Sequence, residues 1–266
     1  TLVMRMKENN PDRVIYLADA RQSMHFIQVF RCARKTGIVP DTTELVHIGF
    51  GTMNGKDGKP FKTRDGGVMR LEYLLKEIDD EMLNKIKENQ KEKENLNIDE
   101  AEAEQTAKTV ALAAVKYGDL SNQASKDYIF DIDRFTSFEG NTGPYILYTI
   151  VRIKSILSKY EAKGGDISAL KDAIMPAVNA GQKNLMLSLA KFNSSIESAY
   201  EESAPHKICA YIYELANAFN GFYHDTKILS EENEELKKSY ISLLVLTKEI
   251  LEACIDMLGF SAPDRM

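Results

Sequence analysis

The stretch VIYLADARQSMHFIQVFRCARKTGIVPDTTELVHIGFG, residues 14–51, decides the fold of the first part of this 266-residue chain. Residues 14–19 are a short apolar run rich in strand-forming residues, and residues 44–51 form a second such run. Between them, Gly37 follows a segment with apolar side chains at helical spacing, namely Met24, Ile27, Phe30 and Ala33. This order of strand, helix and strand predicts a βαβ unit with two parallel strands.

A segment rich in glycine and lysine, residues 52–69, directly follows the second strand. It has few apolar side chains to bury, which predicts a loop at the edge where open α/β sheets bind ligands. GFGTMNG, residues 49–55, departs in spacing from the dinucleotide fingerprint, and no GK[ST] sequence is present as in a P-loop. Two interpretations stay open: a cationic loop that closes over a polyphosphate, or a solvated surface loop.

From residue 68 onward the spacing of apolar residues is helical almost to the end of the chain. A charged stretch, residues 85–105, predicts an exposed helix and a hinge, with a domain boundary near 96–105. YIFDIDRF, residues 128–135, breaks the helical pattern and fits either a pair of short strands or an irregular loop. Beyond the boundary we expect helices near 104–118, 140–161, 166–177, 182–200, 204–223 and 230–258.

The composition excludes several classes of protein. Apolar residues make up 44% of the chain and charged residues 28%, which argues against global disorder. No apolar run approaches the ~18–20 residues of a membrane helix, so we expect no membrane partner. The cysteines lack CxxC spacing, which argues against a disulfide scaffold or a zinc site and suits a reducing cytoplasm. The formal net charge of -6 argues against a general nucleic-acid coat but allows a local basic site.

A second candidate site lies in NTGPYILYTIVRIKSILSKY, residues 141–160. Pro144 suits the first turn of a helix, after Asn141 or Thr142 as N-cap. One face of this helix carries Tyr145, Tyr148 and Arg152. Another carries Ile146, Ile150, Ile153 and Leu157. Two aromatic rings and an arginine on a polar face are what stacking on unpaired bases requires, and we expect them to be solvent-accessible; the alternative is that both tyrosines belong to the core.

The remaining polar residues form no recognisable catalytic group. The histidines share no spacing with one another or with a cysteine, so we predict no metal site from His25, His47, His206 and His224. No Ser-His-Asp grouping or carboxylate pair stands out. The run EENEELKK, residues 231–238, predicts the solvated start of a helix.

Five segments, taken in their order along the chain, resemble arginyl-tRNA synthetase, a class I aminoacyl-tRNA synthetase. They are VIYLADARQSMHFIQVF (14–30), HIGFGTMNGKDGKPFKTRDGG (47–67), SFEGNTGPYILYTIVRIKSI (137–156), PHKICAYIYELANAFNGFYHDTKIL (205–229) and APDRM (262–266). The first contains the family's Gln-x-x-His-Phe element, and the third resembles the opening helix of its anticodon-binding domain. The resemblance extends over essentially the whole chain.

This resemblance implies an α/β, partial Rossmann-type catalytic half, followed by an all-α anticodon-binding helical bundle of the DALR type. Residues 1–98 would be the C-terminal part of the catalytic domain with connecting helices, and residues 99–266 the anticodon-binding domain. The implied reaction is ATP-dependent ligation of arginine to its tRNA through arginyl-adenylate. The implied partners are ATP, arginine and an arginine tRNA. Mg²⁺ would arrive with ATP, without a protein-bound metal, in a cytoplasmic enzyme that is monomeric at full length.

The resemblance also implies roles for individual residues. Gln22 would sit in the arginine pocket. The positions near ATP would be His25, Gly49, Phe50, Gly51 and Phe61. The catalytic loop, in place of the class's KMSKS motif, would be Lys62, Thr63 and Arg64. The sequence departs from that motif, and either Lys62 or Arg64 would act as its second lysine. The residues that contact the anticodon would be Tyr145, Tyr148, Arg152 and Met266.

The class's HIGH motif, written HxGH, does not occur in the chain. The tyrosine and aspartate that the family places before Gln22 in its arginine pocket are also missing. We therefore expect a C-terminal fragment that begins inside the catalytic domain and does not catalyse alone. Two alternatives stay open: a stand-alone RNA-binding helical protein with a vestigial nucleotide-binding fold, and an unrelated α/β nucleotide-binding protein with a helical oligomerisation domain.

Overall fold

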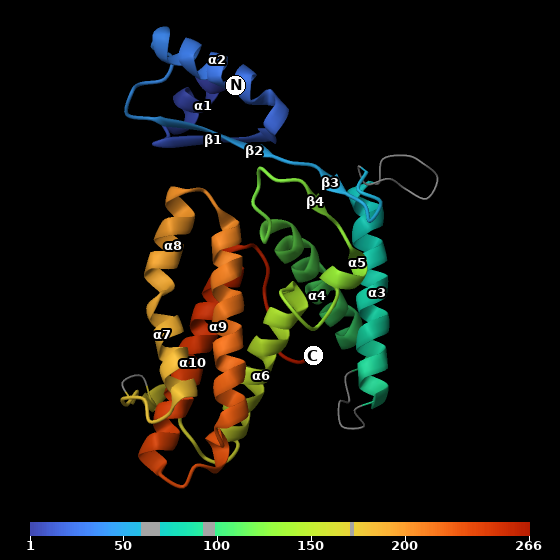
Figure 1. The fold of residues 1–266 in the computed structure, drawn as a ribbon, viewed down its shortest axis with the longest axis vertical. Coiled ribbons are helices and arrows are strands. Elements are labelled where there is room, and N and C mark those ends of the chain that lie inside the picture. Colours follow the sequence, from blue (N-terminus) through green and yellow to red (C-terminus); the bar gives the residue numbers. More distant parts are fainter. Residues whose placement is uncertain (60–69, 93–98, 171–172) are drawn as a thin grey trace. The chain divides into compact units, whose positions relative to one another are not determined.

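The computed structural model describes residues 1–59, 70–92, 99–170 and 173–266 (Figure 1). The chain divides into two compact units, whose positions relative to each other are not determined. The first unit is Thr1–Phe61 with Asn122–Phe130, and the second is Lys62–Ser121 with Asp131–Met266. In the described part of the chain, no helix is long and apolar enough to cross a membrane.

The first unit contains the predicted βαβ unit, and its two strands are parallel as expected. Successive pairs run from Arg13 opposite Glu44 to Asp19 opposite Phe50, so both strands end at the same edge. An additional helix precedes the first strand. In chain order the elements are α1 (Leu2–Asn9), β1 (Arg13–Asp19), the 3-10 turn η1 (Ala20–Gln22), α2 (Ser23–Lys35) and β2 (Glu44–Phe50).

Helix α2 ends where the glycine predicted it. Gly37 has a φ of 68°, in the left-handed region that glycine adopts without strain. Its N–H donates to the carbonyl of Arg34, and the next N–H, of Ile38, donates to the carbonyl of Ala33, at 3.0 Å each. These bonds occupy carbonyls that the end of a helix would otherwise leave without a partner.

The predicted apolar face of α2 is partly wrong. Met24 and Ile27 are 64% and 43% exposed. The other two predicted positions do pack inward, since Ala33 is buried and Phe30 is half-buried. A position outside the predicted face packs there too, because the ring of Phe26 stacks on His47 at 4.5 Å. One step along a helix turns a side chain by about 100°, so two nearby stripes can carry apolar residues and spacing alone cannot choose between them. The buried cluster here is Leu2, Val14, Ala33 and Val39.

A second, shorter strand pair closes the first unit. It joins β3 (Met53–Asn54) in parallel with β4 (Tyr128–Ile129). The stretch 128–135 is therefore one short strand followed by a short helix, α5 (Ile132–Phe135), rather than two strands. The N–H of Gly51 donates to the carbonyl of Ala124 at 2.9 Å, which brings the end of β2 against this returning segment.

The second unit is helical. Figure 1 shows long helices side by side, with α7 and α8 packed along α9, and α6 next to α4 and α10. Besides α5, its helices are α3 (Leu71–Glu92), α4 (Glu100–Leu120), α6 (Gly143–Glu161), α7 (Ala180–Ala190), α8 (Phe192–Glu201), α9 (Pro205–Asp225) and α10 (Glu234–Met257), with 3-10 turns η2 (Ser168–Leu170) and η3 (Ile228–Ser230).

Most of the expected helices are present, with two corrections. The segment expected as one helix at 182–200 divides at Lys191 into α7 and α8. The helix expected at 166–177 is wrong, because the described part of that stretch has only the turn η2. Pro176 disfavours a helical conformation at the residue before it, and the N–H of Met175 donates to Ser239 on α10 instead of a helical carbonyl.

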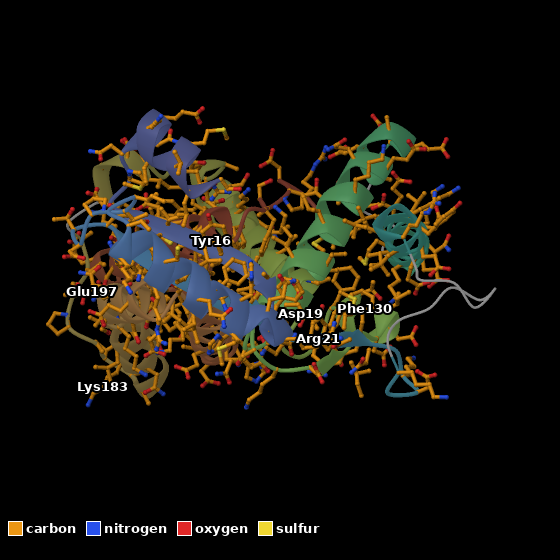
Figure 2. All side chains as sticks on the ribbon, turned by 90° about the horizontal axis from the view of Figure 1, so that it is seen from above. Tyr16, Asp19, Arg21, Phe130, Lys183 and Glu197 are labelled. Atoms are coloured by element: carbon orange, nitrogen blue, oxygen red, sulfur yellow. The ribbon has the colours of Figure 1, made fainter. Side chains whose placement is uncertain are left out.

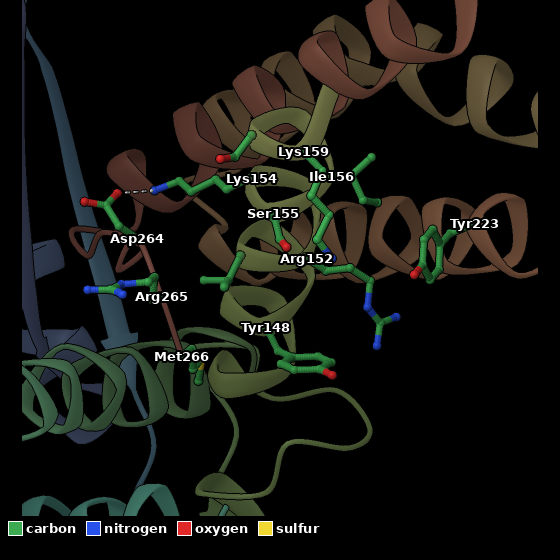
Figure 3. Close-up of a pocket in the computed structure, with 12 residues that line it drawn as sticks. Tyr148, Arg152, Lys154, Ser155, Ile156, Lys159, Tyr223, Asp264, Arg265 and Met266 are labelled. Carbon is green, nitrogen blue, oxygen red and sulfur yellow. Dashed lines mark hydrogen bonds and ion pairs between the residues drawn. The ribbon is translucent and has the colours of Figure 1, made fainter. Parts of the chain in front are cut away.

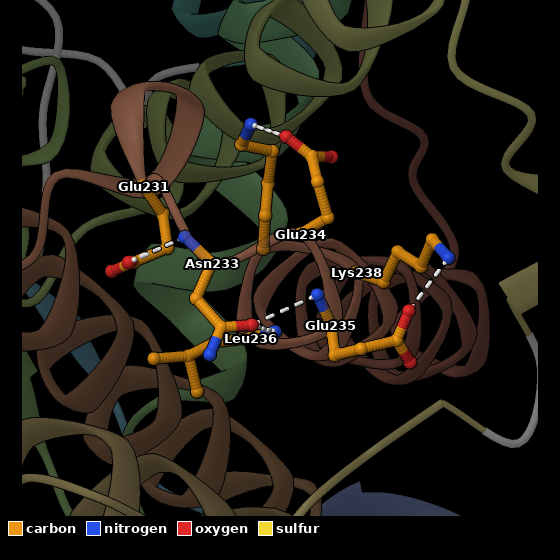
Figure 4. A network of polar contacts seen from close by, with 7 residues as sticks. Glu231, Asn233, Glu234, Glu235, Leu236 and Lys238 are labelled. Carbon is orange, nitrogen blue, oxygen red and sulfur yellow. Dashed lines mark hydrogen bonds and ion pairs between the residues drawn. The ribbon is translucent and has the colours of Figure 1, made fainter.

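Both α6 and α10 begin at a residue whose side chain caps the helix, and Thr142 is one of the two caps expected for α6. Thr142 caps α6 by accepting from the N–H of Tyr145 at 3.2 Å, and Pro144 lies in the first turn. Asn233 caps α10 by accepting from the N–H groups of Glu235 and Leu236 at 3.1 Å each (Figure 4). The run 231–238 is thus a solvated helix start, as predicted. The predicted apolar face of α6 is buried, namely Ile146, Ile150, Ile153 and Leu157.

Candidate functional site

The carboxyl ends of β1 and β2 form one candidate edge, within the first unit. Asp19 is the last residue of β1 and lies opposite Phe50, the last residue of β2. The guanidinium of Arg21 donates to both carboxylate oxygens of Asp19, at 2.9 and 2.6 Å (Figure 2). These hydrogen bonds lower the pKa of Asp19 to about 2, so the carboxylate is ionised at neutral pH. Ligands of open α/β sheets bind outside such an edge.

Several of the residues assigned by resemblance lie near this edge. Gln22 closes η1 and His25 lies in the first turn of α2, and both side chains are exposed. His25 meets the ring of Phe26 edge-on at 5.4 Å. Phe50 is 43% exposed. The roles of these residues toward arginine and ATP remain predictions.

Packing alone accounts for the two glycines at the end of β2. A Cβ at Gly49 would come within 2.9 Å of the Cα of Ala20, so a side chain there would push η1 away from the strand. A Cβ at Gly51 would come within 2.5 Å of the backbone of Lys126. Both glycines are therefore required by close backbone approach, whatever their role toward ATP. The assigned loop residues Phe61, Lys62, Thr63 and Arg64 lie outside the described residues.

The second unit contains a groove of about 880 Å³ (Figure 3). One wall comes from α6, a second from Tyr223 on α9, and a third from the segment after α10. The groove brings together three of the four residues assigned to the anticodon, Tyr148, Arg152 and Met266. The other lining residues are Val151, Lys154, Ser155, Ile156, Ser158, Lys159, Asp264 and Arg265.

Arg152 is the centre of the groove's aromatic part. Its guanidinium carbon lies 4.7 Å from the ring centroid of Tyr148 and 5.3 Å from that of Tyr223. Its Nη1 donates to the side-chain oxygen of Asn220 at 2.6 Å. These three contacts are all with neutral groups, so none of them cancels the positive charge. Figure 3 shows the guanidinium reaching toward Tyr223, with Tyr148 one turn earlier on α6.

Tyr145 is not part of the groove lining. Its hydroxyl donates to Asn217 at 2.6 Å and accepts from the side-chain amide of Asn220 at 2.9 Å. Its ring meets Tyr213 edge-on at 5.8 Å. Burial against these groups raises the pKa of Tyr145, and the hydrogen bond from Asn220 opposes that rise.

The expectation that both tyrosines are largely solvent-accessible is wrong, because Tyr145 and Tyr148 are both half-buried. The cause is α9, which packs beside α6 and supplies polar partners for their face. Neither tyrosine is fully buried in the core either. Both side chains therefore lie between the two alternatives, exposed ring and core ring, that the sequence left open. One ring is held between two helices, and the other lines the groove.

The other charges of the groove hold the end of the chain. Lys154 pairs with Glu252 at 3.4 Å and with Asp264 at 3.3 Å. Arg265 pairs with Glu102 on α4. Lys159 is exposed. The lining therefore combines four cationic side chains with one carboxylate, on a chain that carries a net negative charge.

Sequence reasoning missed the contribution of α9. Tyr213, Asn217 and Asn220 recur at spacings of four and three residues, which makes a polar stripe along a mostly apolar helix. The sequence alone indicates that this stripe faces polar partners. The sequence does not indicate which helix the stripe packs against, because the contacts between α9 and α6 join residues about 70 positions apart.

The described residues offer no cluster for a bound metal. No group of three or more histidine, cysteine, aspartate or glutamate side chains among them could hold an ion.

Two family models match the chain, one for each part of its sequence. Residues 1–132 match the catalytic domain of the class I tRNA synthetases of the arginine type, and residues 146–266 match the DALR anticodon-binding domain. The first match includes α3 and α4, which pack with the helical unit. The expected domain boundary near 96–105 remains a prediction. The fold is that of a class I synthetase catalytic segment joined to a helical anticodon-binding domain.

Individual relatives agree with the two models. The chain is 99% identical over 266 residues to an arginine–tRNA ligase from Agathobacter rectalis, and 53% identical to one from Alkaliphilus oremlandii. The crystal structure of arginyl-tRNA synthetase from Plasmodium falciparum matches the whole chain with a TM-score of 0.81 at 27% identity. The chain belongs to the arginyl-tRNA synthetase family. It spans 45%, 44% and 43% of the lengths of these three proteins.

Proposed function

We propose that the protein containing this chain ligates arginine to its tRNA, with ATP as the second substrate and arginyl-adenylate as the intermediate. In this proposal the first unit contributes to the activation site, and the groove of the second unit binds the anticodon of an arginine tRNA. The family membership supports the reaction, and the curated relatives are named for it.

One observation carries the proposal for RNA: the stack of Tyr148, Arg152 and Tyr223 in an open groove. Unpaired bases are recognised by stacking on aromatic rings and guanidinium planes, with hydrogen bonds to their edges. The exposed amino group of Lys159 and the uncancelled charge of Arg152 suit the phosphates that such bases carry. Met266 adds an apolar contact at the same groove. The segment that forms the groove matches the anticodon-binding model.

The proposal for the first unit rests on the edge formed by β1 and β2. Gln22 would bind the arginine substrate there, because its exposed amide can both donate and accept hydrogen bonds. His25 and the backbone around Phe50 would lie beside bound ATP. Mg²⁺ would be bound by the ATP phosphates rather than held by a protein site. Lys62 and Arg64 would neutralise the charge that develops on the phosphates during transfer, and the hydroxyl of Thr63 would donate a hydrogen bond to them. We place the reaction in the cytoplasm and infer a monomeric full-length enzyme.

The test is binding of a fluorescent hairpin RNA that reproduces the anticodon arm of an arginine tRNA, followed by anisotropy at fixed salt. Tyr148→Ala should weaken binding by about one to two decades, since stacking is worth roughly 1–3 kcal/mol per base. Tyr200→Ala is the matched control, because Tyr200 is 71% exposed on α8 and outside the groove. Equal affinity for both variants would show that the groove is not the RNA site.

The reaction itself is tested on the longer protein that contains this chain. Arginine, ATP and arginine tRNA should give arginyl-tRNA, and Gln22→Ala should raise the KM for arginine. A protein that binds the hairpin but charges no tRNA would instead favour the stand-alone RNA-binding interpretation.

A further inference from the structure

Asn220 joins the groove to the helix beside it. It lies on α9, half-buried, and its side-chain oxygen accepts from Nη1 of Arg152 at 2.6 Å. Its amide nitrogen donates to the hydroxyl of Tyr145 at 2.9 Å and faces the hydroxyl of Thr149 at 3.3 Å. These three partners stand at successive turns of α6, so one side chain links Arg152 to Tyr145, two of the three residues that the sequence singled out on this helix.

The chemistry of these contacts selects an amide. To hold Arg152, the side chain at position 220 must accept a hydrogen bond. To bond the hydroxyl of Tyr145 it must donate one, because that hydroxyl already donates its own proton to Asn217. The hydroxyl of Thr149 donates to the carbonyl of Tyr145 at 3.0 Å, so it too has only acceptor capacity left. A carboxylate could hold the guanidinium but would cancel its charge and could not donate. A neutral amide of this length satisfies all three groups.

The consequence for Arg152 is a fixed guanidinium that remains cationic. The ring centroids of Tyr148 and Tyr223 both lie within 5.3 Å of the guanidinium carbon, and the hydrogen bond to Asn220 restricts its rotation. A guanidinium has five N–H donors, so the bond to Asn220 leaves others for a ligand. An arginine that is ordered before binding loses less side-chain freedom when the ligand arrives.

We propose that Asn220 is a positioning residue for RNA: it holds Arg152 in the orientation that binds an unpaired nucleotide in the groove. This proposal rests on the proposed RNA-binding function. The residue acts through Arg152 and does not itself line the groove.

The test is a double-mutant cycle on hairpin binding, with variants Asn220→Ala, Arg152→Ala and the two combined. Asn220→Ala should weaken binding about tenfold, the size expected for one hydrogen bond to a charged group. In the Arg152→Ala background the same change should alter binding by no more than about twofold, because its target is already absent. Asn217→Ala is the control, since Asn217 also bonds Tyr145 but does not contact Arg152; it should leave binding within about twofold.

Asn220→Asp provides a second readout that a purely structural role would not move. The carboxylate keeps the contact with Arg152 but pairs with its charge, so binding should weaken and the slope of log affinity against log salt should flatten by about one unit. This variant is nearly isosteric, and it keeps the proposal testable if the alanine variant fails to fold.

The outcomes separate the two proposals. If Arg152→Ala binds the hairpin as tightly as the parent, the RNA site is wrong and the positioning role falls with it. If Arg152→Ala weakens binding and Asn220→Ala does not, only the positioning role is wrong. Equal losses from Asn220→Ala in both backgrounds would also overturn it, because the residue would then act independently of Arg152.

Discussion

Arg265 reaches from the segment after α10 to Glu102 on α4, where its Nε and Nη2 donate to the two carboxylate oxygens at 3.1 and 3.0 Å. The pair joins residues 163 positions apart and holds the neighbouring Met266 beside the groove. It is partly exposed, so its value to stability is small, about 0–1 kcal/mol. Its importance lies in where it places the terminal methionine.

Glu102→Gln should therefore loosen the last residues without unfolding the chain. We expect hairpin binding to weaken a few-fold, as it should for Met266→Ala, with little change in melting temperature. Anisotropy and thermal melting on the same samples check this. Glu104→Gln is the control, because Glu104 lies on the same helix and is exposed. If Met266→Ala binds normally, Met266 is not an RNA contact.

Tyr145→Phe should act mainly on stability. The change removes a hydroxyl that bonds both Asn217 and Asn220, so we expect a loss of about 1 kcal/mol in the free energy of unfolding. Tyr223→Phe is the matched variant and should retain both the ring contact with Arg152 and the RNA affinity. Urea unfolding of the two variants decides the matter, and equal stability of both would contradict the assignment of Tyr145 as a tie between helices.

The three cysteines should differ sharply in reactivity. Burial raises the pKa of Cys209 and of Cys254 to about 12, whereas Cys32 is exposed. At pH 8 the buried thiols are ionised to only about one part in ten thousand, and iodoacetamide requires the thiolate. Mass spectrometry after brief alkylation should find the label on Cys32 alone. Modification of Cys209 before the protein unfolds would contradict the buried packing of α9.

The same two thiols predict a pH dependence of stability. Their folded pKa lies above the ordinary value of ~8.5, so the neutral form favours the folded state. This contribution is fully present below about pH 8.5 and is lost as the pH rises toward 12. Chemical unfolding of the parent and of Cys254→Ala at pH 7 and pH 10 checks it: the alanine variant should lose less stability over that interval.

Gly143 should tolerate no side chain. A Cβ there would lie 2.3 Å from the carbonyl oxygen of Ala113 on α4, and backbone cannot yield as a flexible side chain can. Gly143→Ala should lower the free energy of unfolding by about 2 kcal/mol or more. Gly221→Ala is the opposite case, since no atom lies within 4 Å of its added Cβ in the interior of α9. It should stabilise the protein by about 0.5–1 kcal/mol, the helix propensity of alanine over glycine.

The 266-residue chain alone should show no arginine-dependent exchange of pyrophosphate with ATP. The chain contains no HxGH sequence, and a single loop cannot surround the phosphates that react. The measurement is incorporation of labelled pyrophosphate into ATP, with the longer protein as positive control. Exchange above a buffer blank would overturn the expectation that the chain is inactive by itself.

Local chemistry made much of the fold predictable. Gly37 marked the end of α2, Pro144 with Asn141 or Thr142 marked the start of α6, and the spacing of Ile146, Ile150 and Ile153 identified its buried side. Each of these signals acts within a few residues of where it is read, so a single sequence contains it in full.

What failed depends on contacts between distant segments. The exposure of Tyr145 is set by α9, whose Asn217 lies 72 positions away. The orientation of α2 depends on which of two apolar stripes meets the sheet, and Phe26 rather than Met24 does so. The break before α7 is set in part by Ser239, which takes the N–H of Met175. In each case the spacing of residues indicates which side chains could be buried. The element that packs against them determines which of these side chains are buried in the structure.

The contact of Gly143 with α4 bears on how the groove could be transplanted. The first turn of α6 packs against the backbone of Ala113 on α4. Helix α4 therefore sets the position of α6 along its axis, and with it the positions of Tyr145, Tyr148 and Arg152. Asn220 and Tyr223 reach the same face from α9. A designer who grafted α6 and α9 alone onto another scaffold would carry the side chains but lose their register. The smallest portable form of the face shared by α6 and α9 is three helices, because α4 fixes the position of the other two, and the complete groove also needs the segment after α10.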